Sequence, residues 1–468
     1  MKAKYCEQAG CLQRDSVERQ EYVGAPSTRT RDSKEQGGAS DLLEKILDRD
    51  NMNRAYKQVK RNQGAPGVDG ITVETVLPWL REHKDELLES IRNGSYRPNP
   101  VRRKEIPKPD GTGRRKLGIP TVTDRIIQQA IAQQLQTIFD PLFSDSSYGY
   151  RPKRSAQQAI RKVKQYAQEG YVHAIEIDLS KYFDTINHEL LMNLLRKQIP
   201  DKRVTEVIKR YLKSGVMENG IICKTEEGSP QGGPLSPLLA NIYLNEFDQE
   251  MERRGMKFVR YADDIVVLTK SKRAAKRMLK SCGKYLEGKL KLTLNYQKSK
   301  TVSVLARKYF KFLGFCLGKT GKGIFIRAHQ SSLSKAKQKL KELTRRNQGR
   351  NVRVVIEKVK QYIQGWLGYY STAEMKEILR KWSEWLRRRF RMYIWKQWKK
   401  PKTRVENLQR LGISKEQAYQ WGNSRLGYWR VAGSQILKCS ITNEKLALAG
   451  YYDFPAKYEQ IRKMHLCD

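Results

Sequence analysis

The stretch FVRYADDIVVL, residues 258–268, predicts two short strands joined by a tight turn at Ala262 and Asp263. Apolar residues run up to the turn and away from it, as they do in strands of a buried sheet. The turn would hold Asp263 and Asp264 side by side at the tip of a hairpin. Most Asp-Asp pairs are turn or helix-cap residues, so this pair indicates a functional site only if further acids join it.

A third acid ends the strand predicted for YVHAIEID, residues 171–178. Ile175 and Ile177 would face one side of a sheet and Asp178 the other, as in a half-buried strand. If this strand lies beside the hairpin, Asp178 reaches the acids of the turn, although it lies 85 positions before Asp263. Clustered carboxylates repel one another, and a hard divalent cation relieves that repulsion. Two Mg²⁺ ions held in this way are the standard device for phosphoryl transfer.

Composition narrows the class of partner. Lys and Arg number 92 against 49 Asp and Glu, a net charge of +43 over 468 residues, while 39% of the residues are hydrophobic. That apolar share excludes wholesale disorder. The charge surplus points to a polyanionic partner, most simply nucleic acid, with an ordinary basic enzyme as the alternative.

The sequence has neither a candidate membrane-spanning stretch nor a pattern of paired cysteines. No apolar stretch approaches the ~18–20 residues that span a bilayer, and the first residues contain no secretory apolar core. The seven cysteines include no CxxC pair, which argues against a zinc ribbon and a disulfide framework. A reducing compartment is therefore expected.

The flanking sequence predicts further elements. A helix is expected from Asp41, with Glu44 three residues later as a capping box. Residues 101–120 predict a β-hairpin that turns at Pro109-Asp110-Gly111. From about residue 328 the pattern becomes helical, and residues 331–400 carry 20 Lys and Arg against five Glu. This last region is expected to bind phosphates.

Several specific motifs accompany these features. In chain order they are IPKPDG with LGIPTVTDR (106–125), SYGYRP (147–152), DLSKYFD (178–184), SPQGGPLSPLLAN (229–241) and RYADD (260–264). Together they resemble the reverse transcriptases encoded within bacterial group II introns, also called maturases. The similarity runs from about residue 41 to at least residue 400. It implies an α+β fold, a right-hand polymerase with fingers and palm (antiparallel sheet plus helices) and an α-helical thumb, domain X.

The resemblance also implies a division of the chain into segments. Only His329 and His465 follow residue 320, and no cysteine pairs accompany them, so the type that lacks the family's His-Asn-His endonuclease is expected. The segments are a flexible N-terminal extension (1–40), an N-terminal extension with fingers (41–165), a palm with the YADD hairpin (166–325), a helical thumb or domain X (326–400) and a short C-terminal nucleic-acid-binding segment (401–468).

In this family the acids would form the polymerase triad. The resemblance assigns catalysis and metal binding to Asp178, Asp263 and Asp264, with the backbone carbonyl of Leu179 as a further metal ligand. It assigns Lys298, in LNYQKSKT, to protonate the leaving pyrophosphate, although three other lysines lie nearby. The cofactor would be two Mg²⁺ ions, with Mn²⁺ as a substitute.

Four residues would meet the incoming dNTP. Lys108 and Arg115, on the basic hairpin, would contact the triphosphate; the alternative is a solvated basic finger that touches template. Phe183 would lie under the sugar and exclude a 2′-hydroxyl, or else it is a core residue. Gln231 would line the nascent base pair beside two glycines that let the backbone approach it, or else this segment is a turn before a helix.

Two further sets of residues would hold nucleic acid. Leu313 and Gly314, in KYFKFLG, match the turn that holds the 3′ end of the primer. In the thumb, apolar helix faces would pack together while cations on the other faces grip phosphates. The thumb tryptophans are expected in its core, with stacking on unpaired RNA bases as the alternative. The arginines expected to bind RNA are Arg387, Arg388, Arg389 and Arg391.

The predicted function is that of an RNA-directed DNA polymerase, a Mg²⁺-dependent nucleotidyltransferase that copies intron RNA into cDNA for retrohoming and binds that RNA to assist splicing. Its partners would be group II intron RNA, an RNA template with a DNA primer, dNTPs and target DNA, and no membrane; the oligomeric state stays open. Its place would be the bacterial cytoplasm, at the nucleoid. Two alternatives remain: a domesticated reverse transcriptase in defence or DNA repair, and an RNA-binding splicing factor with a decayed polymerase.

Overall fold

The computed structural model describes residues 41–107, 113–218, 221–223, 227–229 and 232–467. These residues belong to one unit that begins at Ser40. The N-terminal extension, Lys108, the turn at 109–111 and Gln231 lie outside the described residues. Across the described helices, no segment has both the length and the apolar character that a membrane span requires.

The first described elements are three helices, and the N-terminal cap predicted for the first of them is not formed. The capping box at Asp41 and Glu44 is wrong: Asp41 makes no cap hydrogen bond and pairs with Lys45 at 3.4 Å, while Glu44 pairs with Arg92 at 3.1 Å. The effective cap is Asp48, whose carboxylate accepts two backbone N–H groups of the second helix. The helices are α1 (Leu42–Leu47), α2 (Arg49–Asn62) and α3 (Val76–Arg92).

The predicted basic hairpin is present as β1 (Val101–Pro107) and β2 (Arg114–Ile119), paired antiparallel. It belongs to a four-stranded sheet of order β2-β1-β4-β5, completed by β4 (Val216–Glu218) and β5 (Ile221–Cys223). The long helix α4 (Val122–Phe139) follows β2 directly and packs against α2. The hairpin therefore leads directly into α4, the helix on which α1 and α2 pack.

A second four-stranded sheet carries the predicted acids. Its order is β6-β7-β3-β8, antiparallel throughout. Ile175 and Ile177 face a core that helices α8 and α9 share, whereas Ala174 faces another core that α5 joins, and Glu176 pairs with Lys300 at 3.1 Å. The strand predicted as half-buried is thus covered on both faces. The elements are α5 (Ala156–Gln168), β3 (His173–Ile177), α8 (Ser236–Arg253), β6 (Lys257–Tyr261), β7 (Asp264–Thr269), α9 (Lys272–Gly288) and β8 (Lys300–Ser303).

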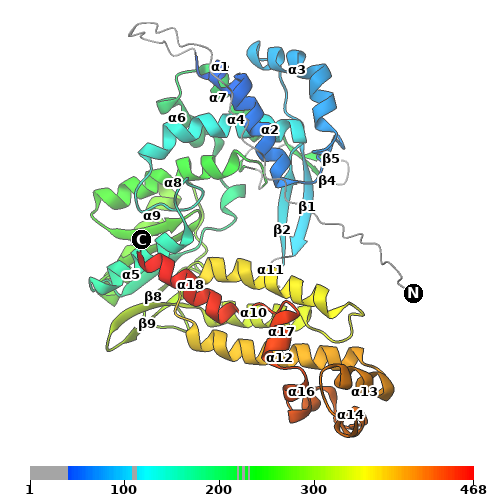
Figure 1. Ribbon diagram of the computed structural model, residues 1–468. Helices are drawn as coiled ribbons and strands as arrows, with labels where there is room; N and C mark the ends of the chain where they lie inside the picture. Colours follow the sequence, from blue (N-terminus) through cyan, green and yellow to red (C-terminus); the bar gives the residue numbers. More distant parts are fainter. Residues whose placement is uncertain (1–40, 108–112, 219–220, 224–226, 230–231, 468) are drawn as a thin grey trace, which may run out of the picture. The chain divides into compact units, whose positions relative to one another are not determined.

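The helical region after residue 328 is present as predicted (Figure 1). Trp382 and Trp395 are buried in it, and Trp385 and Trp398 are partly buried against the same core, which agrees with the expected packing role. A hairpin of β9 (Phe315–Thr320) and β10 (Gly323–Ala328) leads into α10 (Gln330–Leu343), α11 (Val352–Tyr370) and α12 (Lys376–Gln397).

The C-terminal helices return to the thumb helices. Both α15 and α18 pack on α12. Tyr458 of α18 donates its hydroxyl to the Ala373 carbonyl at 2.6 Å and accepts the Met375 N–H at 3.1 Å. The remaining elements are η1 (Asp140–Leu142), η2 (Tyr182–Asp184), α6 (His188–Gln198), α7 (Lys202–Lys213), α13 (Pro401–Arg410), α14 (Lys415–Gly422), α15 (Tyr428–Val431), α16 (Gln435–Ser440), α17 (Asn443–Leu448) and α18 (Phe454–Cys467).

Candidate active site

Asp178 and Asp264 lie at the same end of neighbouring strands. The last residue pair between β3 and β7 is Ile177 with Ile265, so the next position in the register sets Asp178 opposite Asp264. Residues opposed in this way on antiparallel strands have Cα atoms ~4.5–5.5 Å apart. Asp263 occupies the turn directly before Asp264. The two distant parts of the sequence therefore meet at one edge of the palm sheet.

The carboxylates at this edge influence one another. Desolvation raises the pKa of Asp264 to about 6, with Asp263 and Asp178 adding to the rise and Lys311 opposing it. Desolvation also raises the pKa of Asp263, and the Arg115 guanidinium opposes that rise. A cation placed between these acids would stabilise their charged forms, which burial and mutual repulsion disfavour.

These residues could bind a metal ion if substrate phosphates and waters supply the remaining ligands. Among the described residues, no three acidic, histidine or cysteine side chains form a group that could hold an ion alone. Mg²⁺ rarely needs such a cage, because it is usually bound through one or two carboxylates together with waters and substrate phosphates. Asp178, Asp263 and Asp264 suit that mode. Leu179, whose carbonyl is the predicted extra ligand, follows directly and is buried.

A loop fixes the backbone of Asp178. The Asn295 N–H donates to the Asp178 carbonyl at 2.9 Å, and the Asp178 N–H donates to the Ser299 hydroxyl at 3.1 Å. Lys298 lies in this loop, directly before Ser299. The backbone of Lys298, the predicted proton donor, therefore belongs to the loop that holds Asp178.

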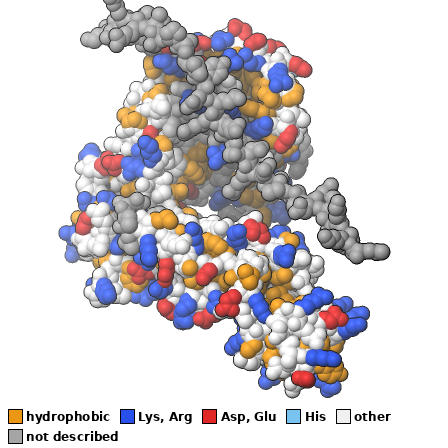
Figure 2. Space-filling model, viewed as in Figure 1, with side chains coloured by type: hydrophobic (Ala, Val, Ile, Leu, Met, Phe, Trp, Pro, Cys, Tyr) orange, Lys and Arg blue, Asp and Glu red, His pale blue; other side chains and the backbone are white. Residues whose placement is uncertain are grey.

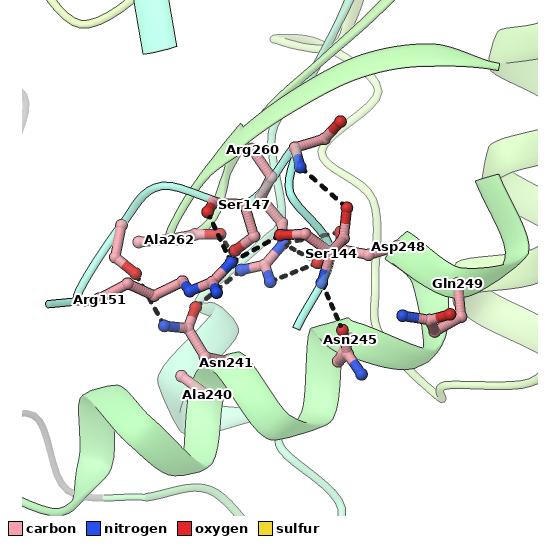
Figure 3. A network of polar contacts seen from close by, with 12 residues as sticks. Ser144, Ser147, Arg151, Ala240, Asn241, Asn245, Asp248, Gln249, Arg260 and Ala262 are labelled. Carbon is pink, nitrogen blue, oxygen red and sulfur yellow. Dashed lines mark hydrogen bonds and ion pairs between the residues drawn. The ribbon is translucent and has the colours of Figure 1, made fainter. Parts of the chain in front are cut away.

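An arginine behind the turn holds its backbone (Figure 3). Arg260 on β6 pairs with Asp248 on α8 through two hydrogen bonds from Nε, at 2.8 and 2.9 Å, and one from Nη2 at 2.5 Å. Its Nη1 donates to the Asn241 side-chain oxygen at 2.8 Å and to the Ala262 carbonyl at 3.1 Å. Both side chains of the ion pair are 0% exposed. The turn that carries Asp263 therefore rests on a buried and paired charge.

The SYGYRP segment packs against the same turn. The Tyr148 N–H donates to the Arg260 carbonyl at 2.8 Å, and the Asn241 side chain donates to the Gly149 carbonyl at 2.7 Å. A Cβ on Gly149 would lie 2.2 Å from the backbone nitrogen of Ala262, so only glycine permits this approach. The segment thus braces the YADD turn from outside the sheet.

Sequence reasoning missed Arg260, Asp248 and Asn241. The signal for the first two was present: a charge stands inside an otherwise apolar strand, and an acid stands on the buried side of α8. Charges in such places need partners. The identity of the partner, however, depends on tertiary structure.

Asp263 opens onto a cavity of about 520 Å³. Arg115 from the basic hairpin and Phe183 line the same cavity, so three of the predicted site residues share one space. Phe183 also packs against the palm core and meets Tyr182 edge-on, with ring centroids 5.3 Å apart. Lining the cavity and packing in the core are therefore compatible for this side chain.

The glycines that follow Gln231 have close neighbours in the protein itself. A Cβ on Gly232 would lie 2.2 Å from the Gly118 carbonyl oxygen, and one on Gly233 would lie 2.3 Å from the Gln128 side-chain oxygen. The expectation was that these glycines let the backbone approach a base pair. The structure shows that the backbone of β2 already requires glycine at position 232, whereas at position 233 only the movable end of the Gln128 side chain lies in the way.

A buried cation in the cavity wall was also missed, although it lies in the LGIPTVTDR motif. Arg125, in the first turn of α4, is 9% exposed and donates to the Ala65 carbonyl at 2.8 Å. Within the described residues its Nε has no hydrogen-bond partner, and desolvation lowers its pKa. A buried cation in the wall of such a cavity favours an anionic ligand there.

The predicted primer grip is a two-residue turn. Phe312 and Phe315 form a bridge around Leu313 and Gly314, whose φ values of 51° and 81° are both positive, as a type I′ turn requires. Tyr369 of α11 donates its hydroxyl to the Leu313 carbonyl at 2.9 Å. A thumb helix therefore fixes the grip, a link that the sequence did not reveal.

The thumb arginines divide into two pairs, and one pair needs correction. Arg389 and Arg391 are each 8% exposed and donate to the C-cap carbonyls of α10 and α16, at 3.0 and 2.8 Å. Cations at helix C-termini are favourable there, so these two side chains tie helices together. Arg391 therefore does not project toward RNA as predicted, whereas Arg389 also lines a hollow beside Trp385. Arg387 and Arg388 are only partly buried.

Two family models match this chain. The model described as "Reverse transcriptase (RNA-dependent DNA polymerase)" matches residues 106–317, which contain the acids, most of the residues that line the cavity and the primer grip. The model described as "Group II intron, maturase-specific domain" matches residues 333–412, which contain most of the thumb helices. The fold is thus that of a reverse transcriptase.

Sequence comparison with individual proteins shows the family to which this chain belongs. Protein YkfC of Escherichia coli is 36% identical over 313 residues, 58% of this chain and 81% of YkfC. The group II intron-encoded protein LtrA of Lactococcus lactis is 37% identical over 252 residues, 53% of this chain but only 41% of LtrA. A chain of a solved "Partial Cas6-RT-Cas1--Cas2 complex" is 27% identical; the match covers 53% of this chain and 42% of that chain, with a TM-score of 0.35. The chain belongs to the reverse transcriptases and maturases encoded by group II introns, which confirms the resemblance.

Proposed function

We propose that the chain copies RNA into DNA in a reaction that depends on Mg²⁺. The observation that carries this proposal is Asp178 opposite Asp264, with Asp263 opening onto the cavity that Arg115 and Phe183 also line. Carboxylates, a guanidinium and an aromatic ring around one space can serve the metal, the triphosphate and the sugar of a dNTP.

In this reaction the primer 3′-hydroxyl attacks the α-phosphate of the dNTP. A new P–O bond forms as the bond to pyrophosphate breaks, and the hydroxyl proton passes to solvent. When bound, two Mg²⁺ ions would supply activation of the hydroxyl and neutralisation of the charge on the departing pyrophosphate, and Mn²⁺ would be a substitute. The ions would be held by Asp178, Asp263, Asp264 and the Leu179 carbonyl, and Lys298 would supply a proton to the pyrophosphate.

The other proposed residues position the substrates, which is the main contribution of a protein to phosphoryl transfer. Arg115 and Lys108 would bind the triphosphate, and Phe183 would exclude a 2′-hydroxyl from the sugar site. Gln231 would contact the nascent base pair. Leu313 and Gly314 would support the primer end.

We propose the parent intron RNA as a second ligand, whose splicing the chain would assist, and target DNA as a third. The maturase-specific match and the net charge of +43 support this. Figure 2 shows Lys and Arg side chains spread over the visible face. The expected place of action is the bacterial cytoplasm, at the nucleoid.

Primer extension tests the proposal. A DNA primer on an RNA template is extended with dNTPs in Mg²⁺, in Mn²⁺ and in chelator, and RNA affinity is measured in parallel. Asp178→Asn should abolish extension and retain RNA binding. Asp184→Asn, an exposed acid of the same DLSKYFD motif, is the matched control and should extend normally. Intact RNA binding by the unmodified chain without any cDNA would favour a splicing factor with a decayed polymerase.

A further inference from the structure

A groove runs between α10 and α12, outside the polymerase cavity. Two adjoining hollows of about 620 and 290 Å³ form it, and they share Ser334, Lys337 and Trp385 in their walls. The first hollow extends to Trp429 of α15, and the second extends to Trp382. None of the predicted catalytic or dNTP-binding residues lines either hollow.

The walls of this groove combine cations with indole rings. Lys337, Lys341, Lys381 and Arg389 contribute positive charge, and no Asp or Glu is among the described residues that line it. Three tryptophans contribute flat aromatic surface. An acid-free lining of this kind repels cations and basic peptides and attracts anions.

The rings are held in place before any ligand arrives. The Arg389 guanidinium lies 5.2 Å from the centre of the Trp385 ring, and its hydrogen bonds to the end of α10 fix it there. The Arg388 guanidinium lies 4.1 Å from the centre of the Trp429 ring and donates to the Trp429 carbonyl at 2.8 Å. Such preorganisation lowers the entropy cost of binding.

Trp429 is nevertheless 39% exposed, which leaves apolar ring surface in contact with water. An apolar peptide could cover the ring but would desolvate the groove cations without compensation. A duplex offers phosphates but keeps its bases stacked inside. A single strand supplies phosphates and free base faces together.

We propose that this groove, lined by Lys337, Trp385 and Trp429, binds an unpaired segment of RNA by stacking bases on the two indoles and pairing phosphates with the lysines. The inference rests on the proposed function, because it names the form in which the thumb meets its RNA. It assigns the base-stacking role, predicted as the alternative for the thumb tryptophans, to Trp385, and it adds Trp429 of the C-terminal segment. Trp382 and Trp395 keep the core role.

The test compares oligonucleotides that differ only in their bases. Binding of a labelled single-stranded oligoadenylate to the full chain is measured against the same strand with abasic positions in its centre. The unmodified chain should bind the intact strand about 5- to 150-fold more tightly, since base–aromatic stacking contributes ~1–3 kcal/mol per base. The double variant Trp385→Leu, Trp429→Leu should lose most of that difference, whereas Trp79→Leu on α3, also a partly exposed tryptophan, should keep it.

Two further measurements keep the inference falsifiable. Photocrosslinking of a thiouridine-labelled strand to the unmodified chain should map to α10, α12 or α15, and crosslinks confined to the palm would overturn it. So would an unmodified chain that ignores base removal, a double variant that retains full discrimination, or a DNA strand that binds the groove as well as RNA. Primer extension by the unmodified chain, run in parallel, separates failure of this inference from failure of the proposed polymerase.

Discussion

Arg260 and Asp248 form an ion pair in which neither side chain reaches solvent, directly behind the turn that carries Asp263. Burial makes the pair costly to break, because removal of one partner leaves the other charge uncompensated. The same guanidinium also supports the Ala262 carbonyl. The pair therefore links the stability of the palm to the geometry of its acids.

Substitutions in this ion pair should affect the free energy of unfolding and the rate of nucleotide incorporation differently. Asp248→Asn should lower the free energy of unfolding by ~3–5 kcal/mol, whereas Asp248→Leu combined with Arg260→Met should recover most of that loss. The double variant should still incorporate dNTP slowly, because the Ala262 carbonyl loses its donor. Urea unfolding and single-nucleotide incorporation measure the two effects. Arg253→Gln, whose side chain is 72% exposed in its pair with Glu250, is the control. Normal incorporation by the double variant would contradict the positioning role.

The pKa of Asp264 predicts a pH-dependent response to Mg²⁺. Its folded-state value of about 6 lies above the ordinary 3.8, so the folded chain binds this proton more tightly than the unfolded chain. Without metal, the free energy of unfolding should therefore fall as pH rises between these two values. Mg²⁺ should raise the melting temperature more above pH 6 than near pH 4, and Asp264→Asn should remove that difference. An equal Mg²⁺ effect at both pH values would argue against metal binding at this carboxylate.

Gly149→Ala should damage the site although the added group is a single methyl. The new Cβ would lie 2.2 Å from the backbone nitrogen of Ala262, so the YADD turn or the SYGYRP segment must move. Nucleotide incorporation should fall by more than tenfold, while RNA affinity should change little. Gly288→Ala, at the end of α9 with nothing within 4 Å of its Cβ, should be neutral or slightly stabilising. Equal behaviour of the two variants would refute the close-packing argument.

Tyr369→Phe should weaken use of the primer. The change removes the hydroxyl that donates to the Leu313 carbonyl but keeps the ring stacked on Phe315. A lost hydrogen bond of ~0.5–1.5 kcal/mol should raise the KM for primer–template about 2- to 10-fold and leave kcat nearly unchanged. Steady-state extension checks this, with Tyr419→Phe as a control because that ring is 69% exposed. A fall in kcat alone would show that the hydroxyl acts elsewhere.

The hairpin and the acidic strand were predictable because their signal is local. Alternation and turn chemistry in FVRYADDIVVL fix β6, β7 and the turn, and the register with β3 follows from pairing Ile177 with Ile265. The failed capping box shows the limit of such rules. Asp41 and Glu44 have the right spacing, but Lys45 and Arg92 compete for their carboxylates.

The thumb arginines show why site residues on helices are harder to predict. The run RRRFR places Arg389 and Arg391 on α12 with no local sign of which side will be covered. Their acceptors at the ends of α10 and α16 lie about 50 residues away in both directions along the chain. Only the packing of these helices decides that both guanidinium groups turn inward.

Single-nucleotide incorporation by Asp263→Asn on a primed RNA template tests the central claim most directly. The substitution keeps the shape of the turn residue and removes its charge. The account predicts a loss of incorporation of at least about 10²-fold, with RNA affinity almost unchanged. Incorporation at the rate of the unmodified chain, or an equal loss of RNA binding, would contradict the assignment of the palm acids to catalysis.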